Sequence, residues 1–558
     1  DNTRVRLYDA VGTQVADNDD TSSTTGGLGS SSGLDSGLTF TSASGGTYYI
    51  QVGAFTSGSI LPLAIGDNYM LNVSVTGHAA TAPAATIWDS TTNAGEGNDE
   101  VYGSSEYDTV NGDGGNDTIY TLAGNDTIRG GLGNDLGFAG DGTDLVYEEG
   151  GDDVMDGGAG TDTISYVFAT AGVTVNLATT VAQNTIGAGS DTLTGFENLS
   201  GSNFNDTLTG DALANVMRGN LGTNTINGAA GNDWIYYTGG SDIVDGGADS
   251  DTYDMTGSFV GWTVDLRAGT GSASSGGQTL SITGVETFYG TFYDDVITSL
   301  SGTPIYAYYG DDYVYAIAGV PQTIYGGVGI DTIDTTDIVS LNYVYGVNLE
   351  TGASTDGETY AEFENLVMGN TADTATGSSV ANNDTIDGAA GDDILEGGTG
   401  TNSINGGADF DMASYQHAAS AVTVSLAIAG AQNTGIGSDT LSNVEGLIGS
   451  AFNDSLTGNG ADNRFVGGLG NDIMSGGGGI DIVDYRTATA GITASLQVVG
   501  PQNTIGAGSD TFVGIESLYG SEFDDVLVGS GDFSAGVVKG FGGNDLIYSA
   551  LGFDNLDG

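Results

Sequence analysis

Aspartate recurs every nine residues between positions 93 and 165 of this chain, in eight consecutive units. Glycines precede most of these aspartates, and glycine permits sharp turns and close backbone approach. Carboxylate and carbonyl oxygens together form an oxygen-only ligand set, which suits calcium because calcium accepts six to eight oxygens in flexible geometry. The eight candidate metal ligands are Asp99, Asp108, Asp117, Asp126, Asp135, Asp144, Asp153 and Asp162.

Very short strands joined by glycine-rich turns are the elements that would position these carboxylates. An apolar residue such as Val110 or Ile119 stands two places after most of the aspartates and would point into a core. If two units close one coil, each carboxylate lies above that of the next coil, and stacked carboxylates repel unless a cation separates them. The short period predicts an all-β parallel β-roll, or β-solenoid, held together by calcium.

The unit Gly-Gly-x-Gly-x-Asp-x-apolar-x is most complete at 130–135 and 157–162. It resembles the RTX (repeats-in-toxin, haemolysin-type) calcium-binding nonapeptide. The resemblance implies a parallel β-roll that binds multiple Ca2+ ions between successive turns, through the aspartate carboxylates and glycine carbonyls. A disordered acidic loop is the alternative, but disorder requires no apolar residue in phase.

Composition restricts the function classes. The chain has 73 acidic and 8 basic residues, a net charge of −65 and no cysteine. Nucleic acid is excluded as a partner because phosphate binding needs clustered Lys and Arg. The charge favours a divalent counterion, and the lack of cysteine excludes disulfides. No stretch reads as a transmembrane helix.

Residues 1–77 differ from the rest and predict a partial β-sandwich, followed by a linker at 78–92. The strand series resembles the bacterial pre-peptidase C-terminal domain, whose first strands are absent here, so we expect residues upstream of Asp1. The chain also stops in mid-repeat at Gly558, so we expect more residues downstream. Alternating strands are expected at 4–8, 47–52 and 69–75, with a polar turn at 16–20.

Residues 166–558 predict five RTX-like super-repeats, each carrying a β insertion of about 44 residues between aspartate blocks. Recurring Gln-Asn-Thr and Glu-Asn-Leu stretches mark the insertions, which we expect to form wider coils of longer strands on the same axis. Asn224, Asn402 and Asn463 replace aspartate and predict weaker or empty sites. The spacing slips between Asp312 and Asp331, which argues against calcium between them. Further candidate ligands are Asp233, Asp242, Asp251, Asp331, Asp393, Asp472, Asp481 and Asp545.

Little in the sequence supports catalysis. Only two histidines are present, and the His-Glu-x-x-His zinc motif is absent. The nucleophile-elbow pattern at 29–33 reads as a flexible loop, because no strand and helix flank it. Glu148 and Glu149 imitate a glycosidase pair, but a solvated acidic edge is the plainer interpretation. The sequence therefore predicts a protein that is not an enzyme.

Three functions remain open. The favoured one is a secreted, calcium-dependent structural protein at the surface of a Gram-negative bacterium: a surface-layer, extracellular filament or adhesin scaffold. Its expected partners are calcium, further copies of itself in a lattice or filament, or cell-surface polysaccharide. The alternative is the non-catalytic C-terminal secretion or stability region of a secreted hydrolase such as a peptidase. An ice-binding module is disfavoured because the row of threonines breaks after one block.

Overall fold

The computed structural model describes the chain in two compact units. One comprises Asp1–Val73 with Trp88–Thr92, and the other Ser74–Ile87 with Asn93–Gly558. No helix of the described part could cross a membrane. Described are four strands before residue 62 and residues 91–558, apart from 274–275, 301, 318–320, 339–344, 378–382, 532–535 and 550–554.

The first unit contains a four-stranded antiparallel sheet in the order β2-β1-β3-β4. The expected strand at 4–8 falls in β1, and residues 48–52 of the expected strand at 47–52 fall in β3, but the expected turn was wrong at 16–19. Residues 16–19 belong to β2 because they pair with β1, Asp19 opposite Arg4 and Ala16 opposite Leu7. The strands are β1 (Thr3–Asp9), β2 (Gln14–Asp19), β3 (Tyr48–Thr56) and β4 (Ser59–Leu61). The expected strand at 69–75, most of the linker and the loop at 29–33 lie outside the described residues.

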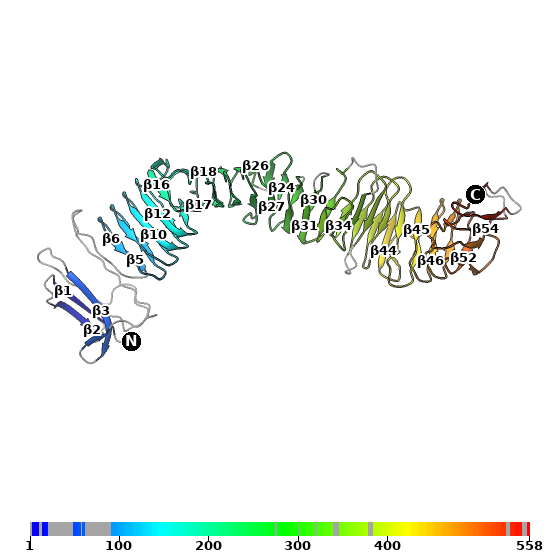
Figure 1. Ribbon diagram of the computed structural model, residues 1–558, viewed down its shortest axis with the longest axis horizontal. Coiled ribbons are helices and arrows are strands. Elements are labelled where there is room, and N and C mark those ends of the chain that lie inside the picture. The colour runs from blue at the N-terminus through cyan, green and yellow to red at the C-terminus, as the bar shows by residue number, and fades with distance from the viewer. Residues whose placement is uncertain are drawn as a thin grey trace. The chain divides into compact units, whose positions relative to one another are not determined.

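The second unit begins as a roll with two strands in each coil (Figure 1). Each strand pairs in parallel with the strand 18 residues later: Val101 lies opposite Ile119, and Val110 opposite Ile128. Alternate strands therefore form two separate ladders, one on each side of the roll. The strands are β5 (Thr91–Asn93), β6 (Glu100–Tyr102), β7 (Thr109–Asn111), β8 (Thr118–Tyr120), β9 (Thr127–Arg129), β10 (Leu136–Gly142), β11 (Leu145–Tyr147), β12 (Val154–Gly160) and β13 (Thr163–Ser165).

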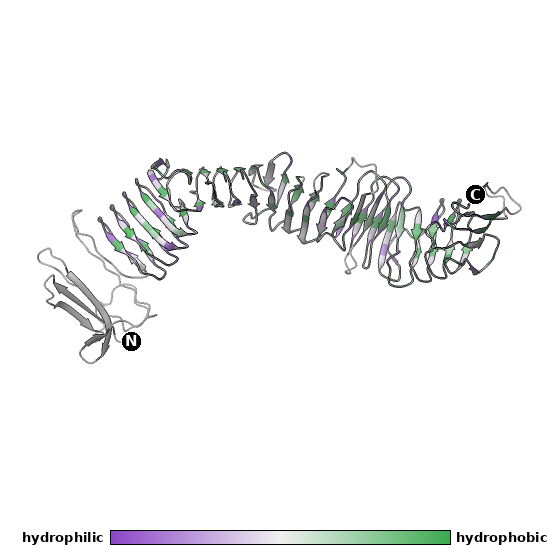
Figure 2. Ribbon diagram, viewed as in Figure 1, coloured by the Kyte–Doolittle hydropathy of each residue, from purple (hydrophilic) through white to green (hydrophobic). Residues whose placement is uncertain are grey.

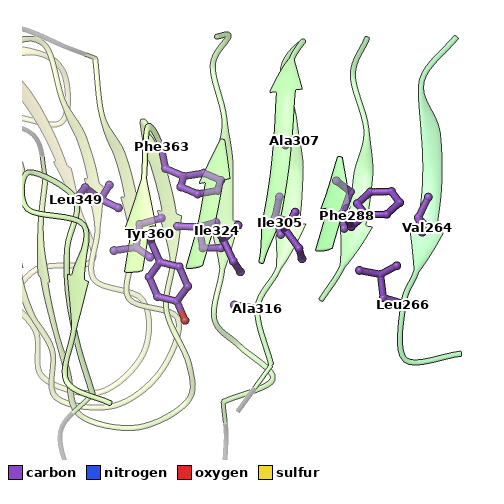
Figure 3. Close-up of a cluster of buried hydrophobic side chains, with 14 of the residues drawn as sticks. Val264, Leu266, Phe288, Ile305, Ala307, Ala316, Ile324, Leu349, Tyr360 and Phe363 are labelled. Atoms are coloured by element: carbon purple, nitrogen blue, oxygen red, sulfur yellow. The ribbon is translucent and has the colours of Figure 1, made fainter. Parts of the chain in front are cut away.

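The core is a row of apolar side chains, one from the middle of most strands. Ile119 and Ile128 are fully buried, while their strand neighbours are only half-buried. Burial of one such side chain contributes roughly 1.5–3 kcal/mol relative to exposure. Figure 2 shows the resulting hydrophobic bands recurring on strands along the roll. Figure 3 shows the same row farther along, where Phe288, Ile305 and Ile324 follow one another on paired strands.

Each insertion contributes three strands, which lie in one sheet in the second and third insertions; in the first, fourth and fifth, the first of the three strands begins a new sheet. In the second, β26 pairs with the preceding coil at β22 (Asp242–Asp245), and β24 pairs with the following coil at β28 (Val296–Thr298). β25 runs antiparallel between them. The insertion strands are β14 (Thr174–Asn176), β15 (Gln183–Asn184), β16 (Ser190–Thr194); β24 (Trp262–Asp265), β25 (Thr270–Ala273), β26 (Thr279–Thr283); β33 (Tyr345–Asn348), β34 (Ala353–Ser354), β35 (Thr359–Ala361); β42 (Thr423–Ser425), β43 (Gln432–Asn433), β44 (Ser438–Ser442); β50 (Thr493–Ser495), β51 (Gln502–Asn503) and β52 (Ser509–Val513).

The expectation of longer strands was wrong, because these strands have only two to five residues. Side-chain hydrogen bonds join these short strands to one another. Gln183 Oε1 accepts a hydrogen bond from the Asn176 N–H at 2.8 Å, and Gln183 Nε2 donates to the Asn176 carbonyl at 3.1 Å. Gln432 and Gln502 bond β42 and β50 in the same way. The Gln of the Gln-Asn-Thr stretch therefore joins two strands.

The third insertion lies in the opposite sheet from the other four. Its strand β35 pairs with β31 (Thr323–Val328), which belongs to the ladder of β11 and β13. In the other four insertions the corresponding strands, β16, β26, β44 and β52, pair with strands of the opposite ladder. Both sheets of the roll can therefore accept an insertion.

Candidate calcium sites

The aspartates of the first block form two continuous ladders. The backbone N–H of Asp108 donates to Asp126 Oδ1 at 2.7 Å, and that of Asp126 donates to Asp144 Oδ1 at 2.7 Å. Asp117 and Asp135 are joined likewise on the other side, at 2.8 Å. The strand register places each carboxylate directly against the amide of the preceding coil. These side chains are at most 2% exposed.

The second oxygen of most of these carboxylates is buried and has no hydrogen-bond partner. A buried anionic oxygen without a partner carries a desolvation cost that a cation would remove. The Oδ2 atoms concerned are those of Asp117, Asp126, Asp135, Asp144, Asp162, Asp233, Asp251, Asp312, Asp331, Asp373, Asp393, Asp411, Asp472 and Asp481.

Glycine keeps the space beside these oxygens free. A Cβ at Gly112 would collide with the carbonyl oxygen of Gly130 and with Asp117 Oδ2. A carbonyl from one coil and a carboxylate from another therefore converge at this point. Gly131 adopts a positive φ of 105°, which favours glycine in the turn that follows. Convergent, hard oxygen donors around a small space fit calcium.

Burial raises the pKa of these carboxyl groups. It raises the pKa of Asp117 to about 7, with Asp135 and Asp99 adding like-charge repulsion. It raises the pKa of Asp312 and of Asp472 to about 8. Without a cation, such groups would take up protons near neutral pH. A divalent ion favours the charged form instead, so calcium binding and proton release are coupled in these ladders.

The family model for the RTX calcium-binding nonapeptide repeat matches nine segments of the chain. The matched segments are residues 93–128, 111–146, 129–164, 191–219, 200–235, 218–253, 380–413, 448–483 and 537–556. These segments are RTX calcium-binding repeats. Such repeats bind multiple Ca2+ ions and are structural elements, typical of secreted proteins. A search of curated proteins found no match.

Most of the predicted ligands lie in these RTX ladders. Asp99 opens one of them, since its N–H donates to Asp117 Oδ1 at 2.7 Å. Asp153 accepts from the Asp135 N–H at 2.7 Å. Asp545 accepts from Asp525 at 3.1 Å but is only half-buried. Buried with an unpartnered Oδ2, as in the first block, are Asp233, Asp251, Asp331, Asp393, Asp472 and Asp481.

Asparagine changes the ladder where it replaces aspartate. Asn224 donates from both its backbone N–H and its Nδ2 to Asp242 Oδ1, the side-chain bond being 2.9 Å long. Asn402 Nδ2 donates to Asp439 Oδ1 at 2.9 Å. The amide nitrogen gives the neighbouring carboxylate a protein partner. Asp242, predicted as a calcium ligand, therefore accepts a side-chain hydrogen bond from the protein, whereas Asp233 and Asp251 each keep a buried oxygen without a partner.

The slip in spacing between Asp312 and Asp331 does not break the hydrogen-bond ladder. Asp312 N–H donates to Asp331 Oδ1 at 2.8 Å, although the two residues are 19 apart. β30 (Tyr313–Tyr315) and β32 (Thr332–Asp334) pair in register, so the extra residue lies in the connecting segment. Both Oδ2 atoms are buried and unpartnered, as elsewhere.

Sequence reasoning missed the glutamates that end one of the two aspartate ladders at each insertion. At the last aspartate of a block, the next acceptor is a glutamate from the insertion, at 2.9–3.0 Å. The pairs are Asp162 with Glu197, Asp251 with Glu286, Asp331 with Glu364, Asp411 with Glu445 and Asp481 with Glu516. The recurring Glu-Asn-Leu stretch was the available signal for four of them, in exact or altered form. Asp411 was also missed, although it stands two nonapeptides after Asp393.

The interpretation of Glu148 as part of a solvated edge was wrong. Its side chain is 1% exposed, whereas Glu149 is half-buried and pairs with Arg129. The position five residues before a ladder aspartate comes directly after a strand and faces inward, between two coils. Net acidity alone therefore misplaced this residue.

Proposed function

We propose that the chain is a secreted, calcium-dependent structural protein of a Gram-negative cell surface, a surface-layer, filament or adhesin scaffold. The observation that carries this is the continuity of one ladder: its strand pairing runs from β5 to β57 (Asn555–Asp557), past four insertions and through the third. Solenoids of this kind present extended surfaces to their partners. Further copies of the chain and cell-surface polysaccharide are the partners we propose.

Calcium would act as the switch between an open and a closed chain. Without it, a net charge of −65 and stacked carboxylates oppose the coils. With it, the binding free energy becomes folding free energy, about 2.7 kcal/mol per site at 100 times the dissociation constant. A chain of this composition would stay loose at low calcium and close at the millimolar calcium found outside cells.

The alternative function is the non-catalytic secretion and stability region of a hydrolase such as a peptidase. The antiparallel sheet β2-β1-β3-β4 that precedes the roll in the chain favours it, because this sheet is not built of RTX-like coils. In this case the roll would fold on calcium but would not assemble.

Sedimentation velocity in EDTA and then in millimolar calcium separates these possibilities. We expect a slow, expanded species in EDTA and large, ordered particles in calcium. A compact monomer in calcium would instead favour the hydrolase region or a single adhesin stalk. Equimolar magnesium is the control, since magnesium demands a stricter geometry than calcium. An unchanged sedimentation coefficient in calcium would contradict calcium-coupled folding itself.

A further inference from the structure

Three buried carboxylates meet where the first RTX block joins the first insertion. Glu148 follows β11, Asp153 precedes β12 and Asp191 lies in β16. One carboxylate oxygen from each lies within 4.8 Å of the other two. All three residues are at most 1% exposed. We call this cluster the junction triad.

Glu148 has a carboxylate oxygen that the protein does not satisfy. Its Oε1 is buried and has no hydrogen-bond partner. The equivalent position, five residues before the ladder aspartate, is glycine at Gly112, Gly130 and Gly157. At Gly112 and Gly157 a carbonyl oxygen lies where a side chain would stand, and Thr121 and Ala139 hold the position in two other units; only at this coil does an acidic side chain occupy it.

The surroundings orient the triad but supply no positive charge. Asp191 Oδ2 accepts hydrogen bonds from the Tyr166 hydroxyl at 3.2 Å and the Thr185 hydroxyl at 3.0 Å. Asp191 Oδ1 accepts the Asp153 N–H at 3.2 Å. Among the described residues, no Arg, Lys or His forms an ion pair with the triad. Three buried carboxylates this close cannot all stay ionised without a cation.

A second junction in the same chain lacks only the glutamate. There Asp472 N–H donates to Asp510 Oδ1 at 3.0 Å, and Asp510 Oδ2 accepts from the hydroxyls of Tyr485 and Thr504. The residue five places before Asp472 is Gly467 instead of glutamate. The hydroxyl and amide framework is therefore common to both junctions, and Glu148 is the addition that makes the first one a triad.

We propose that Glu148, Asp153 and Asp191 together hold one Ca2+ through three side-chain carboxylates; Asp153 also belongs to the RTX ladder, but the other ligands differ from the carboxylate–carbonyl sets of the RTX repeats. Oxygen donors and three negative charges select a hard divalent cation. Near-complete burial favours calcium over magnesium, which gives up its water reluctantly. Because calcium affinity rises with the number of charged ligands, this site fills before its neighbours and fastens the insertion to the block.

Counting bound ions on the full chain tests the proposal. Calcium is titrated against a competing chelator, and the bound ions are counted by native mass spectrometry. We expect Glu148→Gln to bind one ion fewer and to lose the tightest binding step. The amide is isosteric and can donate to Asp153 or Asp191, so the fold should persist. Glu106→Gln, at an exposed position of the same block, is the matched control and should bind as many ions as the unchanged chain.

Gly467→Glu is the converse variant, expected to gain one ion by building the triad at the second junction. An unchanged ion count and tightest step in Glu148→Gln would overturn the proposal. Loss of an ion in Glu106→Gln as well would also overturn it, because the effect would then be one of net charge. If Glu148→Gln fails to fold, an unchanged count in folded Gly467→Glu decides against the triad.

Discussion

The first and second RTX blocks share one backbone ladder but satisfy its carboxylates differently. In the first, the ladder positions are all aspartate, and Asp117 and Asp126 each keep a buried oxygen without a protein partner. In the second, Asn224 Nδ2 donates to Asp242, and Asn215 Nδ2 donates to the Glu197 carbonyl at 2.8 Å.

The difference shows that one fold can be closed by an ion from outside or by an amide from within. A buried charge is stable only when it is paired, and a neutral amide avoids part of that cost. The first block should therefore depend on calcium most strongly, and the second should retain some order without it.

Calcium removal should have the largest effect and should separate the two blocks. In EDTA we expect amide protection to vanish in β8 and β9 and to persist in part in β20 (Thr225–Asn227). Each lost site removes about 2.7 kcal/mol if calcium had been at 100 times its dissociation constant. Hydrogen exchange with mass spectrometry measures this. Equal loss of protection in both blocks would refute the comparison.

Exchanging aspartate and asparagine at ladder positions should have the second-largest effect and should change how strongly folding depends on calcium. Asp126→Asn should remove a calcium ligand and lower the unfolding free energy in calcium by on the order of 3 kcal/mol, since one partner of a buried charge pair is lost. Asn224→Asp should add calcium dependence and destabilise the calcium-free chain. Urea unfolding of each variant, with calcium and with EDTA, gives both values. A calcium-independent loss in Asp126→Asn would contradict the role of its carboxylate.

Filling the glycine space should cost less. Gly112→Ala places a Cβ against the Gly130 carbonyl and Asp117, and we expect a loss of about 1–3 kcal/mol together with weaker calcium binding. Gly460→Ala is the control, because a Cβ there meets nothing within 4 Å. Thermal unfolding in calcium reports both. Equal effects at the two glycines would show that only backbone entropy matters.

Acid should stabilise the calcium-free roll and weaken calcium binding. Burial raises the folded pKa of Asp312 and Asp472 to about 8, above the usual value of about 3.9 for unfolded aspartate. For a raised pKa, the stabilisation is fully present below about pH 4 and is lost as pH rises through about 8. The β-structure that the chain retains in EDTA, measured by circular dichroism, should therefore decrease from pH 5 to pH 8, and calcium affinity should rise over the same range. A β-structure content that increases with pH in EDTA would contradict the burial of these carboxyl groups.

The regular part of the fold could be predicted because its signals repeat. The nine-residue period fixed which residues face the core, and the phase of Asp117 and Asp126 placed carboxylate above carboxylate. The course of the insertions could not be predicted, because it depends on side-chain bonds such as that of Gln183 to β14, which leave no period. The roles of Glu197 and Glu148 were not predicted for a similar reason. A glutamate such as Glu197 occurs once per block and Glu148 occurs only in the first block, so neither belongs to a repeating spacing.

The hydrogen bonds of both ladders run in one direction. The donor amide always lies in the earlier coil and the acceptor carboxylate in the later one, from Asp99 to Asp545. At each ladder position the backbone N–H points toward the following coil and the carboxylate toward the preceding one. The insertion glutamates keep the same direction, because they accept from the aspartate N–H that precedes them in the chain. Evolution could therefore lengthen or shorten such a protein by whole coils without changing the hydrogen bonds between neighbouring coils.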